Sequence, residues 1–420
     1  MYRHDPAHTG YTTSKAPTTS AIQLWNYTTG GRVDSSPAVA NGYVYVGSED
    51  GNVFCLDAST GAQIWSYTQS AESPIYWGSP VVVGDYVYIG CSNGDNNVYC
   101  FTASHGTKIW NYTTNPSSDP AVANGYVYVG SWTDDNLYCL DAYTGAKIWN
   151  YLTVNRAGMP PSSPAVVSGD IYVGAGDYVY CLDAYTGAKI WNYTNGGTVY
   201  YSFSSPAVVN GYVYVGSHDG NVYCLDASTG AKVWNYTTAW NNNGPAHGYH
   251  WGNAVGNPAV AYGCVYVGSS DFDVFCLNAS NGAKVWNYTT GAEVYFSPAV
   301  ADRCVYVGSY DGNVYCLNAS NGAKVWSYPA GIFSPTNIAG GAGSPAVAGG
   351  VVYVVGNGIL YALGAPSTTP SLTTIVIVLV VVLVIVAVAV SFVYSKFTRG
   401  KKADPSSALS PAPPSTPPQP

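Results

Sequence analysis

The feature that most constrains the fold of this chain is an internal repeat. The tetrapeptide S-P-A-V, or a near variant, recurs eight times at intervals of 40 to 52 residues. Each copy is followed by an apolar run such as Y-V-Y-V-G, a polar turn, V-Y-C-L-D, and a segment such as A-K-V-W-N-Y-T. A fixed period of this length is typical of solenoids and propellers. The prolines of the repeat are Pro37, Pro80, Pro120, Pro164, Pro206, Pro258, Pro298 and Pro345.

Each unit is predicted to form four short strands, which is the content of a propeller blade. The first strand lies around S-P-A-V, with Pro at its start, where a missing N–H does least harm. Asn-Gly pairs such as Asn41-Gly42, Asn124-Gly125 and Asn210-Gly211 suit a tight hairpin between the first two strands. The sequence therefore predicts an all-β protein.

One unit is split between the two ends of the repeat region. The eighth unit, Ser344 to Gly364, stops before any Trp, while Ala21 to Thr28 (A-I-Q-L-W-N-Y-T) is a Trp segment with no unit before it. An N-terminal strand that completes the last blade closes a ring and leaves no open edge, whereas a solenoid would not explain the split. We therefore predict an eight-bladed β-propeller over residues 21–364, after a lead-in over 1–20. The eight repeated indoles, expected to pack between blades, are Trp25, Trp65, Trp110, Trp149, Trp191, Trp234, Trp286 and Trp326.

The charge of the chain argues against nucleic-acid binding and is unevenly spread. The chain has 15 Lys and Arg against 23 Asp and Glu, a net of −8 among 420 residues, and only 9% are charged. The part up to Ala365 carries a net of −11, and the rest, with Lys396, Arg399, Lys401 and Lys402, a net of +3.

The C-terminal part predicts a membrane anchor. A Pro/Ser/Thr linker over 365–374 precedes Ile375 to Val393, 19 residues without a charge. In lipid, only a helix satisfies the backbone of such a segment, so we expect one transmembrane helix over 375–394. The basic residues that follow place the C-terminus in the cytoplasm and the propeller outside. The tail over 395–420 is basic, then Pro/Ser-rich, and is expected to be disordered. Because the chain opens M-Y-R-H-D, without an apolar signal segment, we also expect the natural N-terminus to lie upstream.

The unit S-P-A-V…N-G-Y-V-Y-V-G-S…D-G-N-V-Y-C-L-D-A-S-T-G-A-K-V-W resembles the PQQ-like β-propeller repeat over about 21–364. That family includes pyrroloquinoline-quinone dehydrogenases and the propeller lipoprotein of the bacterial barrel-assembly machinery. The ending T-G-A-K-V-W resembles the family's tryptophan-docking motif. The opening R-H-D-P-A-H-T-G-Y-T resembles the segment ahead of the first blade in archaeal secreted members. The resemblance thus implies a secreted or membrane-anchored propeller of archaeal type.

The order of the strands predicts two different faces. We label the four strands of a unit A to D in chain order. The A–B and C–D turns, which repeat N-G and D-A-S-T-G, are expected on one face, and the variable D–A and B–C connections on the other. Variable loops on a constant scaffold are where binding usually occurs, although loop drift with packed aromatics would look the same. An aromatic and acidic face suits sugars, cations or a partner protein. The candidate binding residues are Trp77, Trp132, Tyr201, Trp240, His247, His250 and Trp251.

The sequence does not supply the chemistry that the resemblance implies for the quinone dehydrogenases. Those enzymes use adjacent cysteines near the quinone, and Glu, Asn and Asp around a Ca²⁺ ion, but this chain has no Cys-Cys pair and only Glu49, Glu72 and Glu293. His247 and His250 are two ligands, whereas a zinc site needs three or four. We expect neither PQQ, Ca²⁺ nor another metal, and no catalytic residues. The Asp of L-D-A-S-T-G is predicted to cap its turn.

Cysteines and glycosylation sequons follow the repeat. Seven of the ten cysteines occupy one place in V-Y-C-L-D, and equivalent places in different blades lie too far apart to bridge. Cys264 and Cys304 lie at the start of second strands, where the same argument applies. Only Cys91 and Cys100 are expected to share a hairpin, in diagonal rather than opposite positions, so mostly free thiols are expected. N-x-S/T sequons are candidate glycosylation sites if the propeller is exported. They begin at Asn26, Asn111, Asn192, Asn235, Asn278, Asn287 and Asn318.

Three functions are compatible with these patterns. The one that we favour is a membrane-anchored extracellular propeller that acts as a non-catalytic binding or scaffold module for a glycan or an envelope protein. The alternatives are a PQQ-dependent oxidoreductase that delivers electrons to the membrane, and a structural component of the cell envelope.

Overall fold

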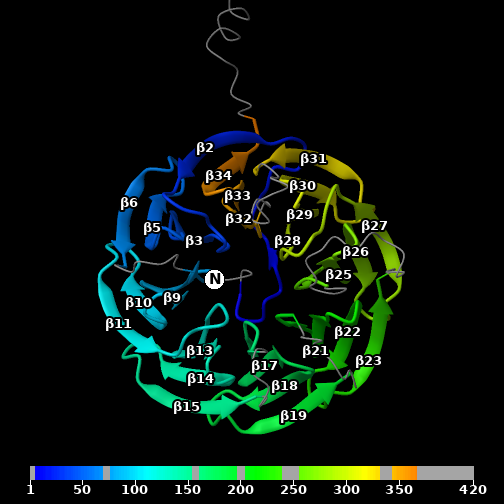
Figure 1. Cartoon of the computed structure of the whole chain (residues 1–420). Coiled ribbons are helices and arrows are strands. Elements are labelled where there is room, and N and C mark those ends of the chain that lie inside the picture. The colour runs from blue at the N-terminus through cyan, green and yellow to red at the C-terminus, as the bar shows by residue number, and fades with distance from the viewer. Residues whose placement is uncertain are drawn as a thin grey trace, which may run out of the picture. The chain divides into compact units, whose positions relative to one another are not determined.

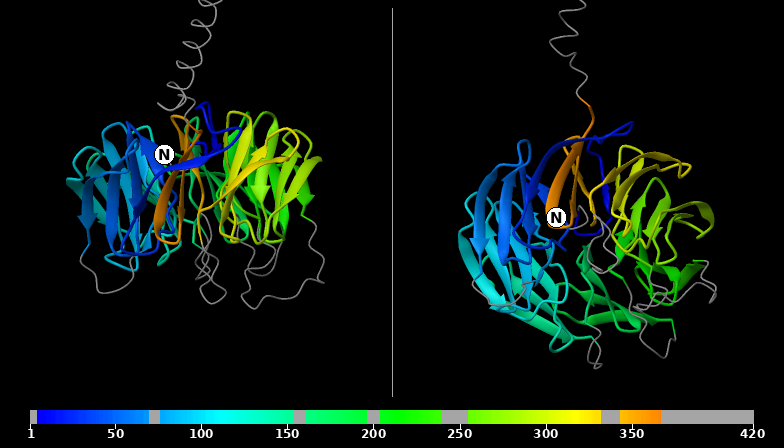
Figure 2. Two further views of the ribbon diagram at one scale, coloured as in Figure 1. Left: turned by 90° about the horizontal axis from the view of Figure 1, so that it is seen from above. Right: turned by 45° about the horizontal axis from the view of Figure 1, so that its top comes forward.

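The computed structural model describes residues 5–69, 76–153, 160–195, 204–238, 255–331 and 343–366. These residues form eight antiparallel sheets arranged as blades around a central axis (Figure 1). Figure 2 shows that the strands of each blade run between the two faces of the ring. The predicted eight-bladed β-propeller with four-stranded blades is confirmed.

Each blade begins with its innermost strand and ends with its outermost one. A short additional strand, β7 (Tyr76–Trp77), pairs with the second strand of the second blade. The blades, innermost strand first, are β3 (Ala38–Ala40), β4 (Tyr43–Gly47), β5 (Asn52–Asp57) and β6 (Gln63–Thr68); β8 (Val81–Val83), β9 (Tyr86–Ser92), β10 (Asn97–Thr102) and β11 (Lys108–Thr113); β12 (Ala121–Ala123), β13 (Tyr126–Gly130), β14 (Asn136–Asp141) and β15 (Lys147–Leu152); β16 (Ala165–Val167), β17 (Asp170–Ala175), β18 (Tyr178–Asp183) and β19 (Lys189–Thr194); β20 (Ala207–Val209), β21 (Tyr212–Gly216), β22 (Asn221–Asp226) and β23 (Lys232–Thr237); β24 (Ala259–Ala261), β25 (Cys264–Gly268), β26 (Asp273–Asn278) and β27 (Lys284–Thr289); β28 (Ala299–Ala301), β29 (Cys304–Gly308), β30 (Asn313–Asn318) and β31 (Lys324–Pro329); β32 (Ala346–Ala348), β33 (Val351–Gly356), β34 (Ile359–Gly364) and β2 (Ile22–Thr28).

The N-terminal strand closes the ring, as the split repeat predicts. β2 pairs antiparallel with β34, with Trp25 opposite Ala362, so the last blade combines the two ends of the repeat region. In the A–B hairpins, Asn41 and Gly42 both have positive φ, at 53° and 81°, and Asn124-Gly125 and Asn210-Gly211 repeat this geometry. These are the backbone angles that a type I′ turn requires, which explains the Asn-Gly pairs.

The hydrophobic core lies between neighbouring blades rather than within each one. In seven blades the docking Trp donates its indole N–H to a main-chain oxygen of the next blade, and in the remaining one to the lead-in. A buried Tyr hydroxyl from the second strand donates to the same oxygen in each case. Trp191 Nε1 and Tyr172 Oη, for example, lie 2.9 and 3.2 Å from the Ala227 oxygen. The acceptors, in ring order from Trp25, are Ala58, Ala103, Ala142, Ala184, Ala227, Ala279, Ala319 and Pro17.

Pro17 takes the place of a turn that the split blade lacks. In the other blades the acceptor belongs to the C–D turn, but in the last blade those two strands come from opposite ends of the chain. The Pro17 oxygen accepts from Trp326 Nε1 at 2.7 Å and from Tyr306 Oη at 3.3 Å. The lead-in therefore supplies one member of an otherwise repeated set of contacts.

The Asp of the C–D turn caps that turn. Asp57 Oδ1 accepts hydrogen bonds from the main-chain N–H and hydroxyl groups of Ser59 and Thr60, at 2.6 to 3.0 Å. Hydrogen bonds from these groups lower the pKa of Asp57. Hydrogen bonds from the turn also lower the pKa of the equivalent aspartates, which are Asp141, Asp183 and Asp226.

These four aspartates predict a specific acid sensitivity. Because their folded pKa values lie below the ordinary 3.8, they stabilise the fold at neutral pH, and this contribution is lost as the pH falls through the lowered values. Blades six and seven carry Asn278 and Asn318 instead, whose Oδ1 atoms accept the corresponding bonds without titrating. Replacing all four Asp by Asn should therefore flatten the pH dependence of thermal unfolding below about pH 4. An unchanged acid dependence would contradict this role.

The predicted segments beyond the propeller lie outside the described residues. The chain divides into two units, residues 1–366 and residues 367–420. Among the described residues, no helix is long and apolar enough to cross a membrane. The transmembrane helix over 375–394 therefore stays a prediction that the structure does not support.

Candidate binding face around the channel

The variable connections gather on one face of the ring. In the first blade the main-chain N–H of Glu49, in the B–C turn, donates to the Arg32 oxygen in the D–A segment at 2.7 Å. Trp132 N bonds to the Asn115 oxygen at 2.9 Å in the third blade, in the same relation. On the opposite face each C–D turn bonds to its A–B turn, as Ala58 N does to the Gly42 oxygen. We call the first of these the loop face.

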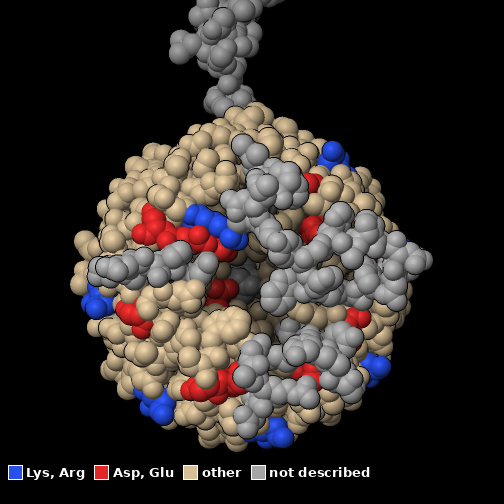
Figure 3. All heavy atoms as spheres, in the orientation of Figure 1, with Lys and Arg blue, Asp and Glu red and all other residues tan. Residues whose placement is uncertain are grey.

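The lead-in runs along the innermost strands at the centre of the ring, beside the central opening that we call the channel (Figure 1 and Figure 3). The oxygens of Pro6, Ala7, Thr9 and Gly10 accept hydrogen bonds of 2.7 to 2.9 Å. Their donors belong to four successive blades and are the main-chain N–H groups of Val166, Val208, Val260 and Val300. β1 (Tyr11–Thr12) then pairs parallel with β28. The lead-in thus covers strand edges that would otherwise present unpaired groups to the channel.

Two residues with positive φ allow this path. His8, at φ 56°, is 1% exposed, and Gly10 has φ 65°. A Cβ on Gly10 would lie 2.7 Å from the Ala259 Cβ and 3.0 Å from the Pro298 oxygen. The Asp5 carboxylate caps the turn between them by accepting from the main-chain N–H of Thr9 at 3.0 Å. The motif D-P-A-H-T-G therefore encodes a turn and a close approach, a role that the sequence reasoning missed.

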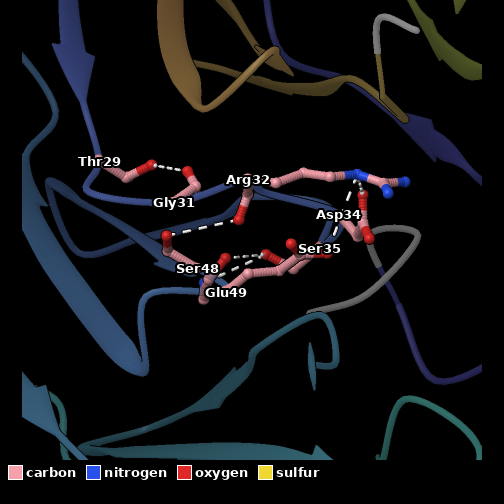
Figure 4. Close-up of polar contacts among 8 residues, drawn as sticks. Thr29, Gly31, Arg32, Asp34, Ser35, Ser48 and Glu49 are labelled. Atoms are coloured by element: carbon pink, nitrogen blue, oxygen red, sulfur yellow. Dashed lines mark hydrogen bonds and ion pairs between the residues drawn. The ribbon is translucent and has the colours of Figure 1, made fainter. Parts of the chain in front are cut away.

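A charged cluster lies where the first and last blades meet on the loop face (Figure 4). The Arg32 Nε atom lies 2.6 Å from Asp34 Oδ1 and 3.9 Å from Glu49 Oε1. The pKa of Glu49 is raised, mainly because the side chain is partly buried. A hydrogen bond with the Asp34 carboxyl group and the negative charge of Asp34 raise it further. Arg32 and Glu49 also line a pocket of about 380 Å³ together with Asn357 and Gly358. In Figure 3, Asp and Glu side chains lie closer to the central opening than most Lys and Arg side chains do.

A ring of hydrogen bonds links the blades beside the channel. It is made by the residue that precedes each repeat proline, and in most blades its main-chain N–H donates to the side chain of the same residue in the next blade. Ser36 N to Ser79 Oγ, Asp119 N to Ser163 Oγ and Ser297 N to Ser344 Oγ measure 3.0, 3.1 and 3.0 Å. The members are Ser36, Ser79, Asp119, Ser163, Ser205, Asn257, Ser297 and Ser344.

One predicted binding residue can be placed fully. Trp132 is 48% exposed in the turn between β13 and β14 and lines a pocket of about 190 Å³ together with Asp119. Trp77 lies in β7, where only its backbone is described, and pairs with Cys91. The other predicted residues lie outside the described part of the chain; they are Tyr201, Trp240, His247, His250 and Trp251.

Several acidic residues of this face serve the fold. Asp134 and Asp219 accept hydrogen bonds from the hydroxyls of Tyr138 and Tyr223 at 2.5 and 2.6 Å. Asp311 accepts one from Tyr315 at 2.5 Å. The acidity that suggested ligand binding is therefore partly structural, and Asp119 and the Arg32 cluster are the residues that sequence reasoning overlooked. These residues could have been found because they differ from the residues at the same place in other blades. The difference is clearest at Asp119, where most blades have Ser.

All ten cysteines are free, as predicted. The structure nevertheless corrects one point, because two additional pairs share a hairpin. Cys264 lies diagonal to Cys276 across β25 and β26, and a hydrogen bond from the Cys276 thiol lowers the pKa of Cys264 to about 7. Cys304 and Cys316 repeat this arrangement in the next blade. The sequence argument compared equivalent positions in different blades and overlooked neighbours within one blade.

Comparison with known proteins assigns the family. A PQQ-type repeat model described as outer membrane protein assembly factor BamB matches residues 11–96, 94–271 and 237–367. The chain belongs to this family. BamB from Moraxella catarrhalis is a similar structure, with a TM-score of 0.64 and 22% identity, covering 82% of this chain and 98% of that one.

Enzymes are also similar in structure, with higher TM-scores and lower sequence identities. A quinohemoprotein alcohol dehydrogenase from Comamonas testosteroni has a TM-score of 0.70 at 16% identity, covering 87% of this chain and 80% of that one. A europium-containing methanol dehydrogenase has a TM-score of 0.71 at 13% identity, with 87% and 97% covered. A beta-alanine-activating enzyme from Danio rerio is 41% identical over 78 residues, only 16% of this chain and 7% of that enzyme. These likenesses establish the fold and do not decide between an enzyme and a scaffold.

The two pockets described above do not fit a quinone cofactor. PQQ carries several carboxylates and needs cations around it, but Arg32 is the only Lys or Arg that lines the two pockets described above, and it already pairs with Asp34. Within the described part of the chain, no three His, Cys, Asp or Glu side chains gather in a way that could hold a metal ion. The lead-in also bonds to the inner strands of four blades. We therefore derive no reaction through this cofactor.

Proposed function

We propose that this protein is a non-catalytic binding or scaffold module, displayed outside the cell by a membrane anchor at 375–394. Its loop face would contact an envelope protein or a glycan. The observation that carries the proposal is the contrast between faces: the turns of one face repeat from blade to blade, while the other presents the exposed Trp132 and two pockets. Membership of a family described as an assembly factor supports a protein partner.

The sequons support the proposed extracellular location in part. Five of them, including Asn111 and Asn235, are exposed on outermost strands. Asn278 and Asn318 are half-buried, and their Oδ1 atoms cap turns. We propose that glycosylation of an exported propeller occurs on the outer strands. We also propose that the protein is of the archaeal type that the resemblance implies.

A matched pair of variants in one blade tests the binding face. Trp132→Ala removes an exposed aromatic from the loop face, and Tyr143→Ala removes one that is 61% exposed in the C–D turn of the opposite face. We expect Trp132→Ala to weaken binding to purified cell-envelope fractions about tenfold, because exposed indoles often dominate an interface, and Tyr143→Ala to change it little. Equal effects of the two substitutions would refute the assignment of the face.

The dehydrogenase alternative has its own readout. The full-length protein, incubated with PQQ and Ca²⁺, should acquire no quinone absorbance and oxidise no alcohol or sugar in the presence of an artificial electron acceptor. Cofactor-dependent oxidation would overturn the proposal.

A further inference from the structure

The hydrogen-bond ring contains one residue whose charge the ring does not require. The Oδ1 atom of Asp119 accepts a hydrogen bond from the main-chain N–H of Ser79. At the same place in other blades a serine hydroxyl accepts this bond, as Ser163 does from Asp119 and Ser205 does from Ser163. A hydroxyl thus satisfies the structural need, and a carboxylate adds a desolvation cost without adding a blade contact.

The Asp119 carboxylate has no cationic partner within the described chain. The ion pairs found there involve Lys15 with Asp302, and Arg32 with Asp34 and Glu49. Burial raises the pKa of Asp119 to about 6, although hydrogen bonds from Ser79 and Ser163 oppose the rise. The group is therefore mostly ionised at neutral pH, in surroundings that favour its neutral form.

The carboxylate opens into the pocket that Trp132 lines. Gly78 borders the same pocket, and a Cβ at that position would lie 2.9 Å from Asp119 Oδ1, so the glycine leaves the carboxylate accessible. The equivalent position is Ser in four blades, for example Ser162 and Ser204, and Gly in two others, Gly256 and Gly343. The Trp132 loop is fixed by main-chain hydrogen bonding to Asn115, and the buried Ser131 donates to the Thr114 oxygen at 2.7 Å. Asp119 and Trp132 thus depart from the repeat at one place, beside a glycine that leaves room for the carboxylate.

We infer that this pocket between the second and third blades binds an alkylammonium group, with Asp119 as its counter-ion and the Trp132 indole as its wall. A carboxylate and an indole together are the pair that recognises an organic cation. The pocket of about 190 Å³ is small, which suits a slender chain ending in an amine. The group could be a lysine side chain of a protein partner or a free polyamine. This inference rests on the proposed loop-face function when the source is a partner protein.

The first experiment uses n-butylammonium as the probe and the full-length protein labelled with ¹⁵N on its tryptophans. Titration at pH 8 should shift the indole N–H resonance that Trp132→Phe removes, whereas 1-butanol should not shift it. Asp119→Ser restores the residue used elsewhere in the ring and should keep the melting temperature while weakening binding at least tenfold. Equal binding by this variant, or an equal response to 1-butanol, would overturn the inference.

The pH dependence provides a second readout. Since the ligand requires the ionised carboxylate, affinity should be constant above about pH 7 and fall close to tenfold per pH unit below the pKa of Asp119. In Asp119→Ser the residual affinity should not depend on pH between 5 and 8. A wild-type affinity that is the same at pH 5 and pH 8 would also overturn the inference.

Two further probes separate the sources of the amine. A blocked peptide with one internal lysine represents a partner protein, and spermidine represents a free polyamine; tighter binding of either one identifies the source. Failure of this inference can be distinguished from failure of the proposed function. If butylammonium binds but Trp132→Ala leaves envelope binding unchanged, the pocket stands and the scaffold proposal falls; if the reverse holds, the pocket falls alone.

Discussion

Trp191→Ala should lower the free energy of unfolding by about 3–5 kcal/mol, one of the two largest effects that we expect from a single substitution. The indole is 8% exposed, donates to the Ala227 oxygen at 2.9 Å, and packs against Gly230 of the next blade. Its removal leaves a cavity between two blades and takes away one of the two donors to that oxygen. The measurement is the midpoint and slope of urea unfolding.

The neighbouring residue gives the control. Ile190 is 49% exposed on the same strand, so Ile190→Ala should change stability by no more than about 0.5 kcal/mol. If Trp191→Ala lowers the free energy of unfolding no more than Ile190→Ala does, the stability of the blades does not depend on this contact.

Gly10→Val should release the lead-in from the channel. The substituted residue would have to hold φ 65°, at a cost of about 1–3 kcal/mol, and its Cβ would overlap the Ala259 Cβ. The steric overlap adds a further cost of about 1–3 kcal/mol. The total is comparable to the net stabilisation that the hydrogen bonds of the lead-in provide. Hydrogen exchange should show faster exchange at the amides of Val166, Val208, Val260 and Val300, which donate to the lead-in.

Gly42→Val separates strain from overlap. Gly42 also has positive φ, at 81°, but a Cβ there would meet nothing within 4 Å. This variant should strain its own hairpin and leave the four channel amides protected. If both variants expose those amides equally, the close approach at Gly10 is not what holds the lead-in.

Periodicity predicted the ring because every blade repeats the same physical problem. Apolar runs defined the strands, Asn-Gly pairs defined the A–B turns, and the missing Trp of the eighth unit matched the Trp25 segment. The position of Pro17 could not be predicted, since it substitutes for a turn without resembling one. The path of residues 5–12 was equally hidden, because it depends on main-chain groups that carry no sequence signal.

The candidate site was less predictable than the fold. Trp132 was predicted because it is a large aromatic in a variable turn, and its side chain is 48% exposed. Asp119 was missed because it occupies a ring position filled mostly by serine, where only a comparison of blades reveals the extra charge. Asp134 and Asp219 contributed to the expectation of an acidic binding face. Their carboxylates instead accept hydrogen bonds from tyrosine hydroxyls of the same blades.

The contact between Trp326 and Pro17 has a consequence for biosynthesis. The two residues lie 309 positions apart, so the ribosome makes most of the propeller before Pro17 can meet Trp326. Closing so long a loop has an entropic cost that local contacts do not offset until the last strand arrives. We expect nascent chains that end before β34 to keep β2 unpaired, an exposed edge prone to aggregation. Ring closure would then act as a check that translation has reached the end of the propeller.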